Sequence, residues 1–473
     1  MADTVVPFVD LGPATRAVSA ELLVDLERLI AAGSFVNGPY VERFESAYAA
    51  ATGSSHCVGV ASGLDALRLA LIALDLEPGD EVIVPAMTFI ATFEAVVQAG
   101  ARCVVVDVSE SDLCLDPAGV AAAITDRTRC VLPVHLYGQM ADVRALAALA
   151  AGKGVALLED ACQAHGATRD GIRAGTAGTA AAYSFYPSKN LGAMGDAGAL
   201  VTEDEELAAR VRALRQHGEA TRYRSDYVGY TARLDAMQAL VLTHKLPRLA
   251  GWNRQRGEVA AVYSRELLGV GDLMLPSAVA GADHVWHLYT VRTADPEALA
   301  EFLGARGVAT GRHYPELPHL SAAFRDLHAP DGTFPVAEAV ARETLSLPIF
   351  PGITEVQLAA VVEATRAFFA GGERASQRGA VPADLGCRVR RERAGAAVYE
   401  PLWLPDRRQH ENRSVRRDPA GRGNRRGLQD LEPHVRLLGC RDRRRGVRRT
   451  RGHLHQRQAA ARDDGRRLVA DGV

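Results

Sequence analysis

Short aliphatic runs alternate with amphipathic helical patterns along the first 250 residues. After an amphipathic helix over 19–32, the apolar runs predict strands over 57–60, 81–85, 102–106, 130–134, 155–159, 181–185 and 199–202. Apolar positions spaced by three and four residues predict helices between them, over 64–74, 92–99, 117–124 and 143–153. Strands that are apolar throughout and joined by helices predict a mostly parallel sheet covered on both faces, which is an α/β fold.

A smaller region follows this predicted sheet. A long helical pattern runs from Asp235 through Lys245 to Leu267, and the chain beyond it predicts a strand over 287–291 and helices over 296–306 and 355–369. We therefore expect a large domain over residues 1–250, including the N-terminal helix, and a smaller α+β C-terminal domain over 251–370. Ligands of open α/β sheets bind beyond the carboxyl ends of the strands, so functional residues are expected there.

The last hundred residues differ in composition from the rest. Residues 1–370 carry 29 basic and 44 acidic side chains, a formal charge of −15, whereas residues 371–473 carry 26 basic and 13 acidic ones, a charge of +13. All 26 basic residues of this tail are arginine, and apolar residues are too sparse there to show periodicity. Such a tail could bind nucleic acid by neutralising phosphates, or it could arise from a shifted reading frame in GC-rich DNA.

We favour the frameshift, because permitted codons for this tail are compatible with an ordered protein in a shifted frame. Residues 454–464 can be read one base later as FINDKRPRATT, and the stretch before them as VEIGDGVFVGHGVT. An aliphatic residue followed by Gly then recurs every six residues, which resembles the left-handed β-helix of hexapeptide-repeat sugar N-acyltransferases. We expect residues 371–473 to be disordered or a frameshift product, and we do not expect nucleic acid as a partner.

The remaining composition indicates an ordinary globular protein. The chain is 48% hydrophobic and 24% charged, and no apolar stretch reaches the length of about 18 residues that spans a membrane. Its first residues lack the features of a secretory signal, so a cytoplasmic location without a membrane partner is expected. The seven cysteines form no CxxC pair, so the sequence predicts neither a disulfide framework nor a metal site.

Polar residues stand where several predicted strands end. Asp160 closes the strand GVALLED and Gln163 follows it, Ser184 lies in AAAYSFY, and Gly63 begins a helix after CVGVAS. Singly, Asp160 could be a helix cap, Ser184 a satisfied core hydroxyl and Gly63 a turn residue. Together they suit pyridoxal 5'-phosphate (PLP): a carboxylate keeps the pyridine nitrogen protonated, and a helix N-terminus binds the phosphate.

Lysine is rare in this chain, which draws attention to Lys189. There are three lysines, Lys153, Lys189 and Lys245, against 52 arginines. An amine can form a Schiff base with an aldehyde, which a guanidinium cannot. Lys189 lies in the Gly-rich turn YPSKNLG, whereas Lys153 and Lys245 are expected to be solvated charges on helices. Lys189 is therefore the candidate nucleophile for PLP.

These residues and their motifs resemble the DegT/DnrJ/StrS-type nucleotide-sugar aminotransferases, which are PLP enzymes of fold type I with a large seven-stranded sheet domain and a smaller α+β domain. The similarity covers roughly residues 5–370, through motifs such as GSFVNGPYVERFE, GDEVIVPAMTFIAT, LLEDACQAHGA, SFYPSKNLGAMGDAGAL and RHYPELP. The resemblance implies that Lys189 binds the cofactor aldehyde and later moves a proton. It also implies that Asp160 pairs with the pyridine nitrogen and that Gln163 contacts the 3-hydroxyl side of the ring.

The resemblance further implies contacts to the remainder of the cofactor. Phe89, just beyond the strand in EVIVPAMT, would stack on the ring, although as a bare sequence feature it is more often a core residue than a cofactor contact. The backbone N–H groups of Gly63 and Leu64 and the hydroxyl of Ser184 would hold the phosphate.

Family members are dimers whose active sites borrow residues from the partner subunit. A partner asparagine reaches the phosphate from a motif like GYNSRLD, but this chain has Thr231 at that position. A threonine hydroxyl can still donate one hydrogen bond, so weaker cofactor retention is expected. His313 and Tyr314 in RHYPELP correspond to substrate-side residues, or they form a packed pair in the small domain.

The implied reaction moves an amino group from L-glutamate to a nucleotide-linked keto sugar. The motif HVWHLYTVR most resembles relatives that act on dTDP-linked 3-keto-6-deoxy sugars. One alternative is a sugar dehydratase, but those relatives carry His where this chain has Lys189. Another is a non-catalytic PLP-binding sensor or regulatory protein, against which the intact set of site residues counts.

Overall fold

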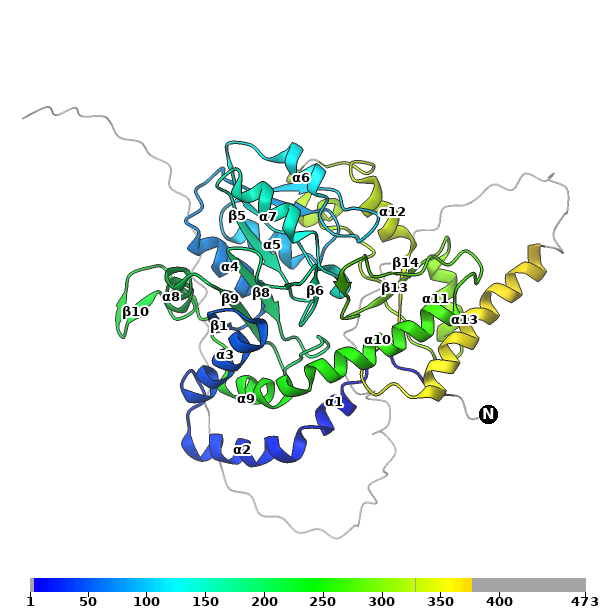
Figure 1. The fold of residues 1–473 in the computed structure, drawn as a ribbon, viewed down its shortest axis with the longest axis horizontal. Helices are drawn as coiled ribbons and strands as arrows, with labels where there is room; N and C mark the ends of the chain where they lie inside the picture. Colours follow the sequence, from blue (N-terminus) through cyan, green and yellow to red (C-terminus); the bar gives the residue numbers. More distant parts are fainter. Residues whose placement is uncertain (1–3, 328, 377–473) are drawn as a thin grey trace, which may run out of the picture. The chain divides into compact units, whose positions relative to one another are not determined.

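The computed structural model describes residues 4–327 and 329–376. Its centre is a seven-stranded sheet with the strand order β1-β9-β8-β5-β4-β2-β3 (Figure 1). In this sheet β9 runs antiparallel to both β1 and β8, and every other neighbouring pair is parallel. The strands are β1 His56–Val60, β2 Glu81–Pro85, β3 Arg102–Val106, β4 Thr128–Val131, β5 Ala156–Asp160, β8 Ala180–Ser184 and β9 Gly198–Thr202.

These seven strands are the seven that the sequence predicts, with bounds that differ by a few residues. The prediction of a mostly parallel α/β sheet is thereby confirmed. β2 and β9 are buried along their whole length, as expected for strands covered on both faces. The sequence signal was strong because a strand buried on both faces is apolar at consecutive positions.

Helices surround this sheet. α4 contacts β1, β5, β8 and β9 as well as α5 and α8, whereas α3 packs on β1 and α9, and α6 and α7 pack together near β3, β4 and β5. The helices are α1 Gly12–Arg16, α2 Ser19–Ala32, α3 Pro39–Thr52, α4 Gly63–Ala73, α5 Ala91–Gln98, α6 Pro117–Ala123, α7 Val143–Ala151, α8 Glu205–Leu214, α9 Ala236–Lys245, α10 Leu249–Glu266, α11 Pro296–Gly304, α12 Pro335–Glu343 and α13 Glu355–Ser376.

Short strands complete the fold. β13 (Tyr289–Arg292) pairs antiparallel with β14 (Thr344–Leu347), and their side chains share an apolar core with α10, α11 and α13. The other short pairs link β6 (Thr168–Arg169) with β7 (Ile172–Arg173) and β12 (Ala282–Asp283), and β10 (Glu219–Thr221) with β11 (Arg224–Ser225). The division into domains at residues 250 and 370 stays a prediction.

Two expectations about particular segments have different outcomes. Lys153 is exposed, as expected, but the expectation that Lys245 is solvated is wrong: its side chain is 5% exposed and donates a hydrogen bond to the Gly192 carbonyl at 2.7 Å. The expectations for residues 377–473 lie outside the described part of the chain. Among the helices within residues 4–327 and 329–376, none has the length and apolar character needed to cross a membrane.

Candidate active site

Asp160 lies where β5 ends, at the same edge as the carboxyl ends of its parallel neighbours. Its side chain is 6% exposed. The carboxylate accepts a hydrogen bond from the Thr92 hydroxyl (3.0 Å) and another from the Cys162 N–H (3.2 Å). Thr92 also contacts the hydroxyl of Thr88 at 2.7 Å. Two donors therefore hold a buried carboxylate in one orientation.

Lys189 lies in the loop between β8 and β9. Its backbone N–H donates to the Tyr186 carbonyl (2.8 Å), which closes a tight turn just after β8. Burial lowers the pKa of the half-buried Lys189 amine, while Cys162 and the carboxylate of Asp160 act in the opposite direction. The amine is thus more easily deprotonated than a surface lysine, as a nucleophile or base requires.

The N-terminus of α4 faces Ser184 and Cys162. Ser62 caps the helix by accepting a hydrogen bond from the Asp65 N–H at 3.0 Å. A Cβ at Gly63 would lie 2.7 Å from the Cys162 sulfur and 2.8 Å from the Ser184 Cβ, so only glycine fits without displacement. Among the described residues, the N–H groups of Gly63 and Leu64 have no hydrogen-bond acceptor.

Gln163 connects three segments that are far apart in the sequence. Its side-chain oxygen accepts a hydrogen bond from the Tyr137 N–H (2.7 Å), and its amide nitrogen donates to the Tyr314 hydroxyl (2.9 Å). Phe89 is 52% exposed, and its ring centroid lies 5.6 Å from that of Tyr314. The fold thus brings Phe89, Gln163 and Tyr314 together.

His313 is held beside this group. Its ring stacks on Phe8 with a centroid distance of 5.4 Å, and its Nδ1 lies 2.9 Å from the Ser346 hydroxyl. Burial, with a smaller contribution from the charge of Lys189, lowers the pKa of His313 to about 4. His313 is therefore neutral at physiological pH.

Thr231 is the predicted site residue that the described chain does not bring to the others. Its side chain is exposed, and its hydroxyl lies 3.4 Å from Nε2 of His217. This is the residue that the resemblance assigns to the partner subunit's site, so an exposed position is compatible with that role.

The chain matches the DegT/DnrJ/EryC1/StrS aminotransferase family over residues 17–366. It belongs to this family. It is 47% identical to the dTDP-3-amino-3,4,6-trideoxy-alpha-D-glucose transaminase of Streptomyces venezuelae, across 76% of this chain and 95% of that protein. It is also 43% identical to the pleiotropic regulatory protein of Geobacillus stearothermophilus, across 77% and 98%.

Solved structures agree with this assignment. The crystal structure of S. venezuelae DesV in complex with a ketimine intermediate has a TM-score of 0.75 and 47% identity, and the match covers 77% of this chain and 98% of that one. The structure of NtdA from Bacillus subtilis with bound cofactor PMP has a TM-score of 0.72 and 30% identity, covering 77% and 85%. The protein is a PLP-dependent aminotransferase of fold type I.

The residues of this aminotransferase fit the cofactor. The two N–H groups at the start of α4, which have no acceptor within residues 4–327 and 329–376, lie next to Ser184 and suit an anionic phosphate. The buried Asp160 carboxylate suits a protonated ring nitrogen, and the Lys189 amine suits an aldehyde. The donor set therefore matches each chemical group of PLP.

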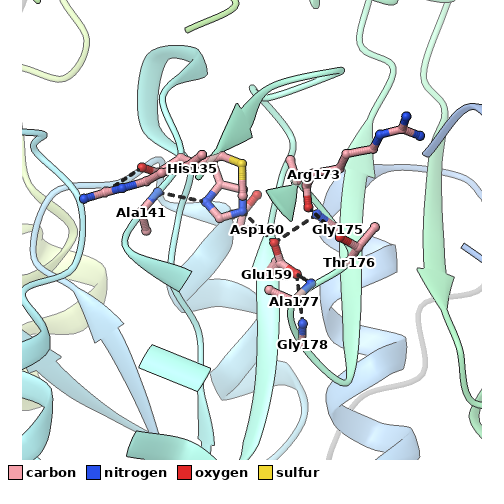
Figure 2. Close-up of polar contacts among 12 residues, drawn as sticks. His135, Ala141, Glu159, Asp160, Arg173, Gly175, Thr176, Ala177 and Gly178 are labelled. Atoms are coloured by element: carbon pink, nitrogen blue, oxygen red, sulfur yellow. Dashed lines mark hydrogen bonds and ion pairs between the residues drawn. The ribbon is translucent and has the colours of Figure 1, made fainter. Parts of the chain in front are cut away.

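A second buried carboxylate supports the strand that carries Asp160. Figure 2 shows Glu159 surrounded by His135 and the turn over 175–178. Glu159 accepts hydrogen bonds from the N–H groups of Gly175, Ala177 and Gly178 at 2.9–3.1 Å and lies 2.8 Å from Nε2 of His135. Because the Ala141 N–H donates to Nδ1 of His135, the proton is assigned to Nε2, which donates to Glu159. This network fixes the end of β5.

Sequence reasoning missed several residues of the site. Thr92 and Tyr137 contact predicted site residues, and Cys162 packs at Gly63, but none of the three was singled out. Cys162 follows the end of β5 by two residues, so the rule that ligands bind at strand ends could have found it. Thr92 lies in the first turn of α5, and its contact with Asp160 exists only in the folded chain. Tyr137 contacts Gln163 through its backbone N–H and the His313 carbonyl through its hydroxyl, and both partners are distant in the sequence.

Proposed function

We propose that this aminotransferase moves the amino group of L-glutamate to a nucleotide-linked keto sugar, specifically a dTDP-linked 3-keto-6-deoxyhexose. The observation that carries the proposal is the association of a lysine of lowered pKa, a buried carboxylate and a free helix N-terminus at one edge of the sheet. The substrate rests on the motif HVWHLYTVR and on the S. venezuelae relative, whose name specifies a dTDP-linked 3-amino sugar.

When bound, PLP supplies an electron sink that acidifies the hydrogen on the carbon bearing the amine. In this proposal Nζ of Lys189 takes that proton from the α-carbon of the donor and later delivers a proton to the aminated sugar carbon. Asp160 keeps the ring nitrogen protonated, with the Thr92 hydroxyl holding its carboxylate in place. The lowered pKa of Lys189 supports its role as a base at neutral pH.

We further assign the contacts around the ring. Gly63 and Leu64 bind the phosphate through their N–H groups, together with the hydroxyl of Ser184. Gln163 contacts the 3-hydroxyl side, and the exposed ring of Phe89 stacks on the cofactor. His313 and Tyr314 bind the sugar substrate, which their proximity to Gln163 and Lys189 supports.

We propose that the enzyme is a homodimer with shared active sites. Helix α2 exposes Leu23 (60%), Val24 (51%) and Ile30 (60%). Two further exposed apolar side chains, Tyr186 and Met194, flank Lys189 in its loop. Contiguous exposed apolar surface is typical of a protein interface, which supports placing both segments at one. In the dimer, Thr231 of each subunit would reach the phosphate bound by the other.

The first test is the absorption spectrum of the PLP-loaded protein before and after addition of L-glutamate without sugar. We expect the band of the lysine-bound cofactor to be replaced by that of pyridoxamine phosphate. A persistent band would refute L-glutamate as the donor. It would then leave a different amino donor, a dehydratase or a non-catalytic sensor as the alternatives.

Two variants test the assigned roles. Lys189→Ala should abolish the band of the lysine-bound cofactor, and a variant that keeps it would refute the assignment. Asp160→Ala should stay folded but lose nearly all turnover, and near-normal rates would contradict its role at the ring nitrogen.

Mixing two inactive variants tests the shared site. Lys189→Ala removes the amine of one subunit, and Thr231→Glu places a carboxylate that repels the phosphate bound by the other, so a mixed dimer keeps one intact site. Random exchange of subunits should therefore restore about a quarter of the wild-type activity. Absence of any recovery, with mixed dimers verified by mass, would contradict the sharing of sites.

A further inference from the structure

A small cavity lies next to the Lys189 loop. It is lined by residues of that loop, by the N-terminal segment around Asp10, and by Lys245, Arg256 and Phe350. Its volume is about 30 Å³. One water molecule needs roughly 10–15 Å³ of such cavity volume. The cavity therefore has room for about two water-sized groups, which is the size of a carboxylate.

Two buried cations line this cavity without an acidic partner. Lys245 is 5% exposed and Arg256 is 3% exposed, and within the described residues neither forms an ion pair. Nη1 of Arg256 donates to the carbonyls of Trp286, His287 and Ile349, but its buried Nε has no hydrogen-bond partner. The carboxylate in the lining is Asp10, whose Oδ1 accepts the Gly12 N–H at 2.7 Å.

Unpaired buried cations are energetically costly, which indicates that an anion normally compensates them. Burial lowers the pKa of Lys245 to about 8 and that of Arg256 to about 10. A bound anion would favour the charged form of both side chains. In a chain that uses arginine almost everywhere, two of the three lysines, Lys189 and Lys245, line this cavity.

We propose that this cavity binds the α-carboxylate of the amino-acid donor, with Lys245 and Arg256 as its cationic ligands. The inference rests on the proposed transamination. Lys189 lines the same cavity, and the amine that reacts is borne by the carbon adjacent to the α-carboxylate. A carboxylate held there would bring that carbon to the Lys189 amine, which is the positioning that proton transfer needs.

Two substitutions of Lys245 separate charge from structure. Lys245→Gln removes the charge but keeps a donor for the Gly192 carbonyl, whereas Lys245→Met removes both. Lys153→Met is the matched control, because Lys153 is exposed. We would measure KM for L-glutamate, KM for the keto sugar, and the Kd of glutarate by calorimetry on the PLP-loaded enzyme.

We expect both Lys245 variants to raise the glutarate Kd and the L-glutamate KM at least tenfold, with the sugar KM and the control unchanged. An unchanged glutarate Kd in Lys245→Gln would overturn the proposal. Defects confined to Lys245→Met, affecting both substrates, would also overturn it and assign Lys245 to holding the loop. If wild type does not react with L-glutamate, the proposed donor is wrong, and glutarate binding still decides the role of the cavity.

Discussion

Replacing Gly63 with alanine tests the proposed phosphate site at its tightest point. The new Cβ would lie 2.7 Å from the sulfur of Cys162 and 2.8 Å from the Cβ of Ser184. These neighbours would have to retreat by roughly 1 Å to restore the normal separation of about 3.5–4.0 Å. The Ser184 hydroxyl and the N–H groups at the start of α4 are both proposed phosphate ligands. The displacement would move them apart, although both have to contact the same phosphate.

The size of the effect follows from the cost of overpacking. One extra methyl group in a tightly packed site typically costs about 1–3 kcal/mol. If that strain is imposed on the cofactor-bound geometry, the Kd for PLP should rise by roughly 5-fold to 150-fold. Gly304→Ala is the matched control, because a Cβ at Gly304 has no neighbour within 4 Å.

The assay is titration of the apoenzyme with PLP, followed by absorbance, together with a thermal unfolding curve for each variant. Adding Cys162→Ala to Gly63→Ala removes one of the two clashes and should recover part of the affinity. A Gly63→Ala protein that binds PLP as tightly as wild type would refute the proposed phosphate site. The thermal unfolding curves then show whether such a variant has lost only stability, in which case the clash affects packing and not a phosphate site.

Two further predictions concern buried polar groups. Thr92→Val keeps the shape of the side chain but removes the hydrogen-bond donor to Asp160. Because a hydrogen bond to a charged group contributes about 1.5–3 kcal/mol, we expect kcat to fall by roughly tenfold or more while the protein stays folded. An unchanged kcat would contradict the positioning role of Thr92. Burial lowers the pKa of His165 to about 3 and that of His313 to about 4 in the folded protein. In the unfolded chain both histidines have a pKa of about 6.5, so as the pH falls they are protonated in the unfolded state before they are protonated in the folded state. Each histidine should then lower the free energy of unfolding by up to about 1.4 kcal/mol per pH unit down to its folded-state pKa, and urea denaturation of His165→Asn should show a shallower pH slope than wild type.

The sequence was most informative where a single physical constraint acts along the chain. The seven strands of the main sheet were predictable because burial on both faces selects consecutive apolar residues. The two-residue strands β6, β7, β11 and β12 were not, because two residues carry no periodicity. Their pairing depends on tertiary contacts, as between Ala282 and Arg169.

The active site was predictable to the extent that it follows strand ends. Asp160 is the last residue of β5 and Gln163 follows three positions later, so both could be singled out from chain order. The hydrogen bond from Gln163 to Tyr314 joins residues 151 positions apart, and only the folded chain can create it. The role of Thr92 is hidden in the same way, because its partner Asp160 is 68 positions away.

Lys245 shows why a polar residue on a helix is the hardest to interpret from sequence. The long helical pattern expected from Asp235 to Leu267 forms two helices, α9 and α10, with a 3-10 turn over Leu246–Arg248 between them, and Lys245 ends α9. A lysine among apolar neighbours is normally interpreted as a side chain that reaches solvent. Here the helix faces the Lys189 loop, so the ammonium group meets the Gly192 carbonyl and a small cavity instead of water. Burying an ammonium group removes its hydration, and this cost is offset only where a carbonyl or an anion takes the place of the lost water. One carbonyl accounts for only one of the three donors of the ammonium, and in our proposal a carboxylate bound in the cavity would meet the others.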